Sequence, residues 1–241
     1  AVLCNDPHLK LSLPSIWYEI QLTAPGVNCY GVSLPGSPGI TIGFNDSIAW
    51  GVTNGARDVK EYFALTLSGD EYQVGEKTYT VEPRIEEIIV RGGEIVYDTV
   101  LYTVYGPLAY KQQDDKYLAL RWLAHDPSNE LKTFYELNRA SNFNDYSDAL
   151  QHYNCPGQNF VFADVKNNIA IWQQGKFRQK PKGYGKFILD GSILEHLNEQ
   201  FIPRLHNPHM LNPERGFVSS ANQAAVDSSY PYYVSGTYEE F

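Results

Sequence analysis

Cysteine is scarce in this 241-residue chain, which holds three cysteines and a single methionine. Cys4, Cys29 and Cys155 cannot all pair with one another, and their spacing matches no zinc-binding pattern. A disulfide scaffold of this length would carry more cysteines. At most Cys4 and Cys29 form a bridge, free and buried thiols are the default expectation, and the cysteine count leaves the redox compartment open.

Long apolar runs, internal repeats and low-complexity segments are also missing. No stretch approaches the roughly 18 consecutive apolar residues of a membrane-spanning helix, so the sequence predicts no membrane span. Lys and Arg number 19 against 28 Asp and Glu, and the net charge of −9 argues against a nucleic-acid partner. The one basic cluster, Lys176 to Lys182, has proline and glycine neighbours that are typical of a solvated loop.

The composition is that of a globular protein, with 43% hydrophobic and 14% aromatic residues and a mean hydropathy of −0.37. It excludes a disordered, collagen-like or coiled-coil chain, and the length suits one large domain or two small ones. Both ends are unusual, because the chain opens on the apolar, strand-like run Ala1–Cys4 and closes at Phe241 without an obvious stop. Natural termini are usually polar and frayed, so we expect a chain cut from a longer protein.

Short β-type runs, separated by glycine, proline and asparagine turns, dominate the first 110 residues. Charged residues at alternate positions between 61 and 110 suggest an antiparallel meander with one wet face. We place this peripheral β-rich subregion at residues 62–120. Strands are predicted over residues 29–34, 40–44, 48–53, 61–67, 72–74, 77–81, 86–90 and 95–100.

Helices are expected later in the chain. Residues 126–130 carry a helix start signal, and a second helix begins at Asn142 or Asn144. Residues 159–164 and 169–173 flank an asparagine-rich turn and predict a hairpin. Beyond it we expect mostly loop, a short helix near residues 192–199 and a last strand over residues 216–220. The predicted class is α+β with an antiparallel core.

Familiar catalytic motifs are absent: the chain has no Gly-x-Ser-x-Gly elbow, no Walker loop and no His-Glu-x-x-His. Asn5-Asp6-Pro7-His8 follows the apolar opening run, where a site is common, although an Asx turn with a surface histidine is the plainer interpretation. Asp58 and Glu61 either share a cation or lie on a solvated turn. Asn222 follows the small residues 219–221, where it either donates to an oxyanion or satisfies a turn.

Several ordered segments go further than these single residues. They are Asn5–Leu9, Leu13–Glu19, Gly31–Gly39, Gly43–Asn54, Gln158–Asp164 and Arg215–Gln223. In this order they resemble the β-subunit of the penicillin acylase (penicillin amidase) family, which belongs to the N-terminal nucleophile hydrolases. Each segment alone is weak, but together they are highly specific and span residues 5–223.

The resemblance implies an αββα sandwich built on two antiparallel sheets. It also implies an amidohydrolase that cleaves C–N bonds other than peptide bonds, in N-acyl compounds of the penicillin or acyl-homoserine lactone type. The nucleophile of that family is an N-terminal serine exposed by autoproteolysis, whose own α-amine, with a pKa near 8, serves as base. An acyl-enzyme forms and water releases the acid, and no cofactor is required for this chemistry.

The resemblance also assigns roles to five residues. Asn222 corresponds to the oxyanion-hole asparagine that acts through its side-chain amide, and Asn54 to the residue whose backbone N–H is the second donor. His8 corresponds to the neighbour that supports the nucleophile by hydrogen bonding. Asp58 and Glu61 correspond to ligands of a structural calcium, an ion that prefers carboxylate oxygens.

Parts of the family pattern are missing from these residues. The nucleophilic serine is expected about fifteen residues before Ala1, because only the first residue of the subunit carries a free α-amine. No internal serine replaces it. The α-subunit and the C-terminal part of the β-subunit are absent as well, so we expect residues 1–241 to be a partial β-subunit that is inactive alone and that needs those segments as partners.

Three functions compete on this basis. The first is hydrolysis of an N-acyl amide, with a periplasmic or secreted location and a role in antibiotic biosynthesis, as the resemblance implies. The second is a non-catalytic binding or structural relative that has lost the nucleophile. The third, a carbohydrate-binding module that uses surface aromatics, fits the composition but explains none of the ordered motifs.

Overall fold

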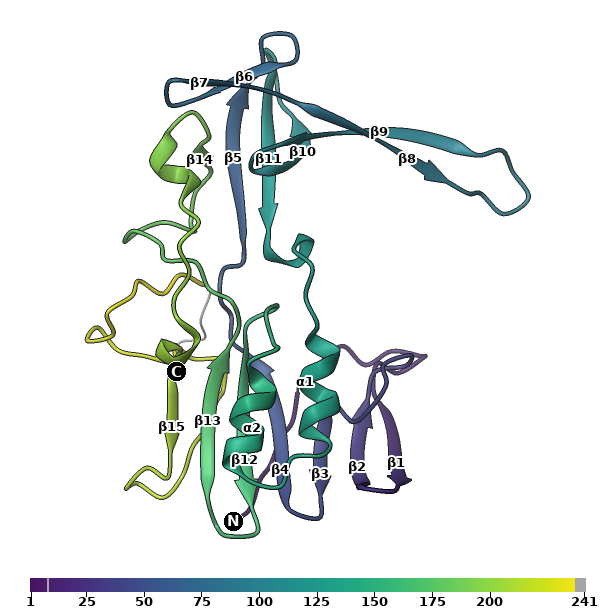
Figure 1. Cartoon of the computed structure of the whole chain (residues 1–241), viewed down its shortest axis with the longest axis vertical. Coiled ribbons are helices and arrows are strands. Elements are labelled where there is room, and N and C mark those ends of the chain that lie inside the picture. Colours follow the sequence, from purple (N-terminus) through teal and green to yellow (C-terminus); the bar gives the residue numbers. More distant parts are fainter. Residues whose placement is uncertain (8, 237–241) are drawn as a thin grey trace.

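The computed structural model describes residues 1–7 and 9–236. Two sheets, one above the other in Figure 1, dominate it, and two helices lie over one face of the lower sheet. That first sheet has the strand order β1-β2-β3-β4-β12-β13-β15, with antiparallel neighbours throughout. Its elements are β1 (Tyr18–Ala24), β2 (Val27–Ser33), β3 (Ile42–Asn45), β4 (Ile48–Asn54), β12 (Gln158–Asp164), β13 (Ile169–Gln174), β15 (His209–Leu211), α1 (Glu130–Leu137) and α2 (Phe143–Leu150).

The second sheet is inserted between β4 and α1, with one short strand added later in the chain. Its order is β14-β5-β11-β10-β9-β8, and β14 pairs with β5 in parallel while the other pairs are antiparallel. Its strands are β5 (Lys60–Thr66), β8 (Glu82–Ile88), β9 (Val96–Thr103), β10 (Gly106–Lys111), β11 (Lys116–Trp122) and β14 (Leu189–Asp190). A separate hairpin consists of β6 (Glu71–Val74) and β7 (Lys77–Thr80).

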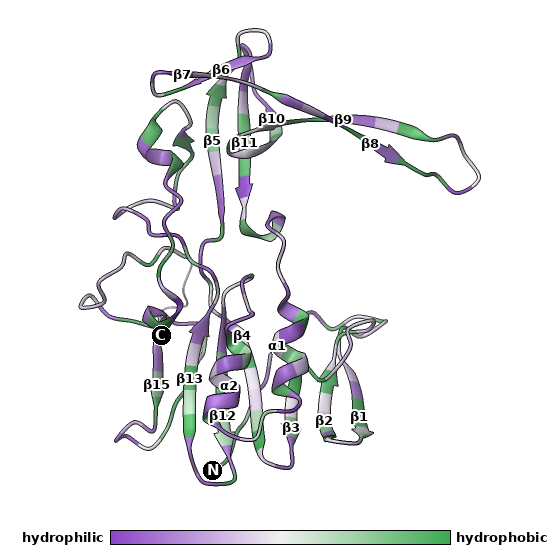
Figure 2. Cartoon of the chain, in the orientation of Figure 1, coloured by the Kyte–Doolittle hydropathy of each residue, from purple (hydrophilic) through white to green (hydrophobic). Residues whose placement is uncertain are grey.

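The β8–β9 hairpin projects from this sheet as a long arm (Figure 1). Both faces of β8 are exposed, and Figure 2 shows hydrophobic positions along the arm. Ile85 and Ile89, for example, are exposed to solvent. No helix in the described part of the chain has the length and apolar character that a membrane crossing requires.

Asparagine caps determine where the two helices begin. The Asn129 side chain accepts a hydrogen bond from the Lys132 N–H, and the Asn142 side chain accepts from the N–H groups of Asn144 and Asp145. Each cap satisfies backbone donors that have no partner within the helix. Both helices are therefore confirmed, and Asn142 is the residue that starts the second. The described residues also contain three short 3-10 helices: η1 (Leu123–His125) before α1, and η2 (Leu194–Leu197) and η3 (Arg204–His206) after β13.

The helices cover an apolar face of the first sheet. Side chains alternate between the two faces of a strand, so Trp50, Phe160, Phe162 and Trp172 from three adjacent strands belong to the same buried cluster. Tyr146 of α2 packs on Phe162 and donates its hydroxyl hydrogen bond to the Phe160 carbonyl at 2.9 Å. Burying each of these large side chains contributes roughly 1.5–3 kcal/mol, which makes this layer the main core.

Asn138, just after α1, fastens the loop that precedes β3. Its Nδ2 donates to the Ile40 carbonyl at 2.8 Å and its Oδ1 accepts from the Ile40 N–H at 2.8 Å, and both residues are buried.

We expect Asn138→Ala to lower the free energy of unfolding by about 2–4 kcal/mol, because it leaves a buried donor and a buried acceptor without partners. Chemical denaturation measures the change. Gln112→Ala, at an exposed position, is the control and should shift the midpoint hardly at all. Equal midpoints for the two variants would contradict the role of Asn138.

Two sequence expectations near the chain's ends are wrong, and one edge strand was missed. Residues 1–4 and residues 216–220 are not strands, and the last strand is β15 instead, paired with β13. The edge strand β1 was not predicted. Strand-like composition does not determine whether a partner backbone lies alongside, and neither of these two segments pairs with a strand. The three cysteines are free, and the Cys29 thiol donates to the Asn138 carbonyl.

Candidate active site

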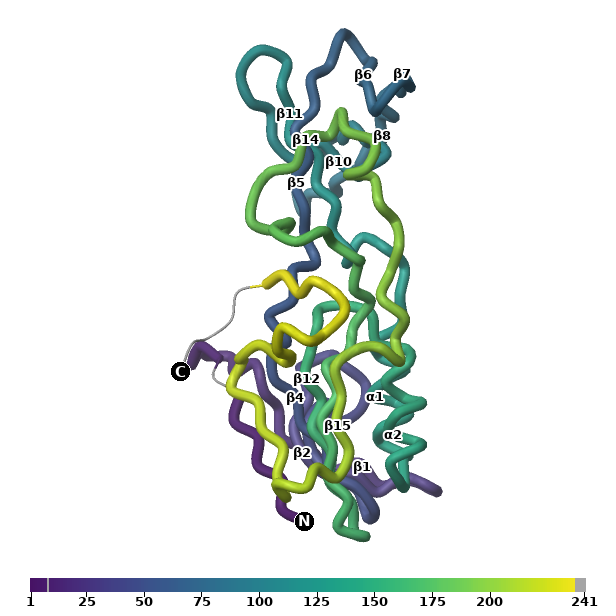
Figure 3. The backbone as a smooth tube through the Cα atoms, turned by 90° about the vertical axis from the view of Figure 1, so that its left-hand side faces the viewer, coloured from purple at the N-terminus to yellow at the C-terminus, as the bar shows by residue number. Residues whose placement is uncertain are grey.

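The face of the first sheet opposite the helices is polar near the end of β4. Strand register places Thr53 of β4 beside Asn159 of β12, and Asn159 beside Gln173 of β13. Asn159 and Gln173 each lie one position from a core aromatic and Thr53 lies three positions from Trp50, so all three point to the other face. Figure 3 shows the N-terminal segment and the segment after β15 on that side of the sheet.

These side chains form one continuous hydrogen-bond network. Gln173 Nε2 donates to Asn159 Oδ1 and to the Gly55 carbonyl, each at 3.1 Å. Asn159 Nδ2 donates to Ser220 Oγ at 3.0 Å, Thr53 Oγ1 at 3.2 Å and the Asn54 carbonyl at 3.3 Å. Because Asn159 and Gln173 are only 3% and 1% exposed, the network fixes the peptide groups on both sides of the Gly55 Cα.

Arg57 closes the network on its far side. Its Nη1 donates to Gln173 Oε1 at 3.0 Å, and its guanidinium lies 4.0 Å from the centre of the Phe177 ring. Burial raises the pKa of the nearby Tyr230 phenol, and the charge of Arg57 opposes that rise. Tyr230 is therefore a neutral hydroxyl near pH 7, and it donates to the His206 carbonyl at 2.8 Å.

Asn54 and Asn222, 168 residues apart, come together at the end of β4. Asn222 Nδ2 donates to the Asn54 carbonyl at 2.8 Å. Asn222 has a φ of +64°, in the left-handed region that asparagine tolerates better than most residues. The Asn54 side chain turns back and accepts from the Ala56 N–H at 2.9 Å, so its backbone, rather than its side chain, faces Asn222.

The N-terminal segment bonds to the backbone of β4 just before Asn54. Two residues earlier, the Asn5 side chain binds both backbone groups of Val52, donating to its carbonyl at 3.1 Å and accepting from its N–H at 3.0 Å. Backbone groups two residues apart on a strand point the same way, and β3 has ended by this point.

Glycine at position 51 is what lets Asn5 lie against β4. A Cβ added there would lie 2.7 Å from Asn5 Oδ1, closer than real Cβ contacts. The Asn5 side-chain amide therefore bonds to the backbone of β4 at Val52, in place of the neighbouring strand β3.

Asp58 and Glu61 also come together, at the start of β5 and away from the Asn54–Asn222 pair. Lys180 Nζ lies between them, 2.6 Å from Asp58 Oδ2 and 3.2 Å from Glu61 Oε1. Elsewhere in the described residues, no cluster of three or more His, Cys, Asp and Glu side chains is arranged to hold a metal ion. His8, the remaining candidate from the sequence, lies outside the described residues.

Sequence reasoning placed Asn5 in a candidate segment but missed Asn159, Gln173 and Lys180 as parts of these clusters. A usable signal existed for two of them. Asn159 and Gln173 are polar residues inside strands that are otherwise largely apolar, and buried polar residues are informative because they need partners. No local pattern marks Lys180, which belongs to the basic cluster expected to be a solvated loop but whose side chain is only 6% exposed.

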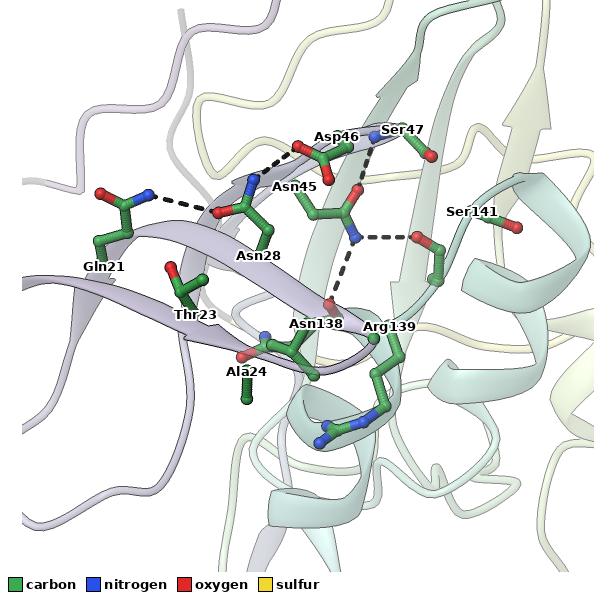
Figure 4. A pocket seen from close by; sticks show the side chains of 13 residues that line it. Gln21, Thr23, Ala24, Asn28, Asn45, Asp46, Ser47, Asn138, Arg139 and Ser141 are labelled. Carbon is green, nitrogen blue, oxygen red and sulfur yellow. Dashed lines mark hydrogen bonds between the residues drawn. The ribbon is translucent and has the colours of Figure 1, made fainter.

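A separate recess lies at the opposite end of β4, between the β1–β2 hairpin and the segment after α1 (Figure 4). Its polar side chains bind one another or backbone: Asn28 donates to Asp46 at 2.7 Å, and Asn45 donates to the Ala140 carbonyl at 2.9 Å. These bonds brace the β3–β4 turn against the helices, and we assign the recess no chemistry.

The family model for penicillin amidase matches residues 1–240. This chain belongs to the penicillin amidase family. Acyl-homoserine lactone acylase QuiP of Pseudomonas fluorescens (strain Pf0-1) is 28% identical over 247 residues, covering 99% of this chain and 30% of that protein. Penicillin G acylase of Escherichia coli is 26% identical over 239 residues, covering 96% of this chain and 28% of that protein.

A solved structure shares the fold of this penicillin amidase family member. The thermostable penicillin G acylase from Alcaligenes faecalis superposes with a TM-score of 0.82 at 24% identity, covering 94% of this chain and 42% of that one. The chain thus spans about 30% of the length of the curated relatives named above. The predicted antiparallel architecture with few helices is confirmed.

Proposed function

We propose that this chain is part of an amidohydrolase that cleaves the linear amide bond of N-acyl compounds of the penicillin or acyl-homoserine lactone type. One observation carries the proposal: the Asn222 side-chain amide, distant in sequence, lies 2.8 Å from the carbonyl of Asn54, the residue whose backbone N–H is the second oxyanion donor in this proposal. The relatives named above are acylases of those two kinds, which supports the same reaction class.

In this proposal the nucleophile is an N-terminal serine on a segment of the enzyme that precedes Ala1. Its hydroxyl oxygen attacks the amide carbon while its α-amine takes the hydroxyl proton. Asn222 Nδ2 and the Asn54 N–H stabilise the negative oxygen of the tetrahedral intermediate, at about 3–4 kcal/mol for each donor. The α-amine then protonates the leaving amine, the acyl-enzyme forms, and water releases the acid.

Asn159 and Gln173 are positioning residues in this proposal. Asn159 Nδ2 donates to the same Asn54 carbonyl as Asn222, and Gln173 Nε2 donates to the next carbonyl, that of Gly55. Their side chains thereby hold the peptide that follows Asn54 and the orientation of the site's backbone donor. Preorganised donors of this kind cost no reorganisation during the reaction.

Further features of the family enter as proposals. We propose that the first sheet packs its polar face against a second layer of an αββα sandwich, supplied together with an α-subunit and further β-subunit segments. His8 would support the nucleophile from the N-terminal segment. Family resemblance is also the basis for proposing autoproteolytic maturation, a periplasmic or secreted location and a role in antibiotic biosynthesis.

The test uses the complete gene product that contains this chain. Intact mass and N-terminal sequencing should find a cut immediately before a serine upstream of Ala1, and a chromogenic phenylacetyl amide should be turned over. Replacing that serine with alanine should abolish both. An uncut product with no serine there and no turnover would instead support the alternative, a non-catalytic binding or structural relative.

A further inference from the structure

Three charged side chains meet at the start of β5 in a nearly closed cluster. The Lys180 ammonium is 6% exposed, and the carboxylates of Asp58 and Glu61 are 15% and 11% exposed. Lys180 Nζ donates to Asp58 Oδ2 at 2.6 Å, to the Asp58 carbonyl at 3.3 Å, and lies 3.2 Å from Glu61 Oε1. An ammonium has three N–H donors, and this cluster offers one oxygen to each of them.

The cluster joins segments that are distant in sequence. Asp58 leads into β5, Lys180 lies on the loop after β13, and the Asp58 N–H donates to the Ser235 carbonyl at 3.0 Å. Gly185 has a φ of +93°, and a Cβ there would collide with the Asp58 carboxylate and with Ser235. The backbone of the loop therefore packs directly on the carboxylate and closes the cluster from solvent.

The cluster has the charges but not the geometry of a calcium site. Calcium takes six to eight oxygen ligands, whereas three oxygens converge here and the point of convergence is filled by a nitrogen. Two partly buried carboxylates side by side repel each other unless a cation lies between them. The Lys180 ammonium meets that need with a covalently attached charge.

We propose that Lys180 is the resident cation of this cluster and holds, in this chain, the place that the family resemblance gives to a structural calcium. The amino group joins the start of β5 to the loop after β13, and the Asp58 N–H joins the same point to the Ser235 carbonyl. The stability of the protein is then independent of calcium. This inference rests on the ion-pair geometry alone and is separate from the proposed reaction.

The test compares Lys180→Met with Lys182→Met in the complete gene product. Lys182 lies on the same loop but is exposed, so it is a matched control. Removing the buried ammonium leaves the two carboxylates without a countercharge, and we therefore expect Tm to fall by about 6 °C or more. Lys182→Met should stay within about 1 °C of the parent, as is usual for surface substitutions.

Metal measurements on the unaltered protein provide the second arm, and they decide the matter if Lys180→Met fails to fold. We expect no stoichiometric calcium by elemental mass spectrometry and the same Tm in millimolar CaCl₂ and in EDTA. Bound calcium in a one-to-one ratio, together with a Tm lowered by EDTA, would overturn the proposal. A Lys180→Met protein as stable as the Lys182→Met protein would overturn it as well.

Discussion

Asn222→Gly should lower kcat of the mature enzyme by about 10²–10³-fold, the usual effect of removing one side-chain donor from an oxyanion hole. Glycine is the right replacement because Asn222 has a φ of +64°, where alanine would add backbone strain and glycine does not. KM should change far less, since the lost interaction forms in the transition state. Initial-rate kinetics on a chromogenic amide measure both constants.

Asn212→Gly is the matched control for that experiment. Asn212 also has a left-handed φ, of +47°, and its side chain is exposed and bonded to Ile169 and Asn168. The control should keep kcat within about twofold of the parent, as expected for a surface residue outside the machinery. An Asn222→Gly enzyme with parental kcat would remove Asn222 from the oxyanion hole.

Asn159→Asp should lower kcat by about tenfold or more while leaving KM nearly unchanged. The substitution keeps the shape of the side chain and the oxygen that accepts from Gln173 Nε2. It replaces Nδ2, which donates to the Asn54 carbonyl at 3.3 Å and to the hydroxyl oxygens of Thr53 and Ser220, with an acceptor. The backbone of Asn54 is then held less firmly. The buried carboxyl also lowers Tm, because a charge there is poorly solvated.

Tyr146→Phe separates loss of stability from loss of positioning. It removes a buried hydrogen bond to Phe160, on the same strand as Asn159 but on the helix face of the sheet, at a cost of about 0.5–1.5 kcal/mol. Tm should fall while kcat stays at the parental value. If both variants lose kcat in proportion to their loss of Tm, Asn159 has no positioning role.

Local signals account for the elements that sequence analysis predicted well. The caps Asn129 and Asn142 act on N–H groups two or three residues away, and the β12–β13 hairpin turns at Asn167, whose φ is +65°. Such short-range chemistry is readable without a fold. The ordered motifs identified the family, and the family resemblance made Asn54 and Asn222 candidates. These motifs reflect common descent rather than a local structural rule.

The sequence by itself thus determined the helix starts, the main hairpin, the family and the candidate donors. Only the tertiary structure decided which side chains meet. Thr53 reaches Asn159 across 106 residues and Lys180 reaches Asp58 across 122, and each meeting depends on strand register and on how a loop folds back. A register shift of one residue would turn Asn159 into the core, and no pattern within a single segment encodes that choice.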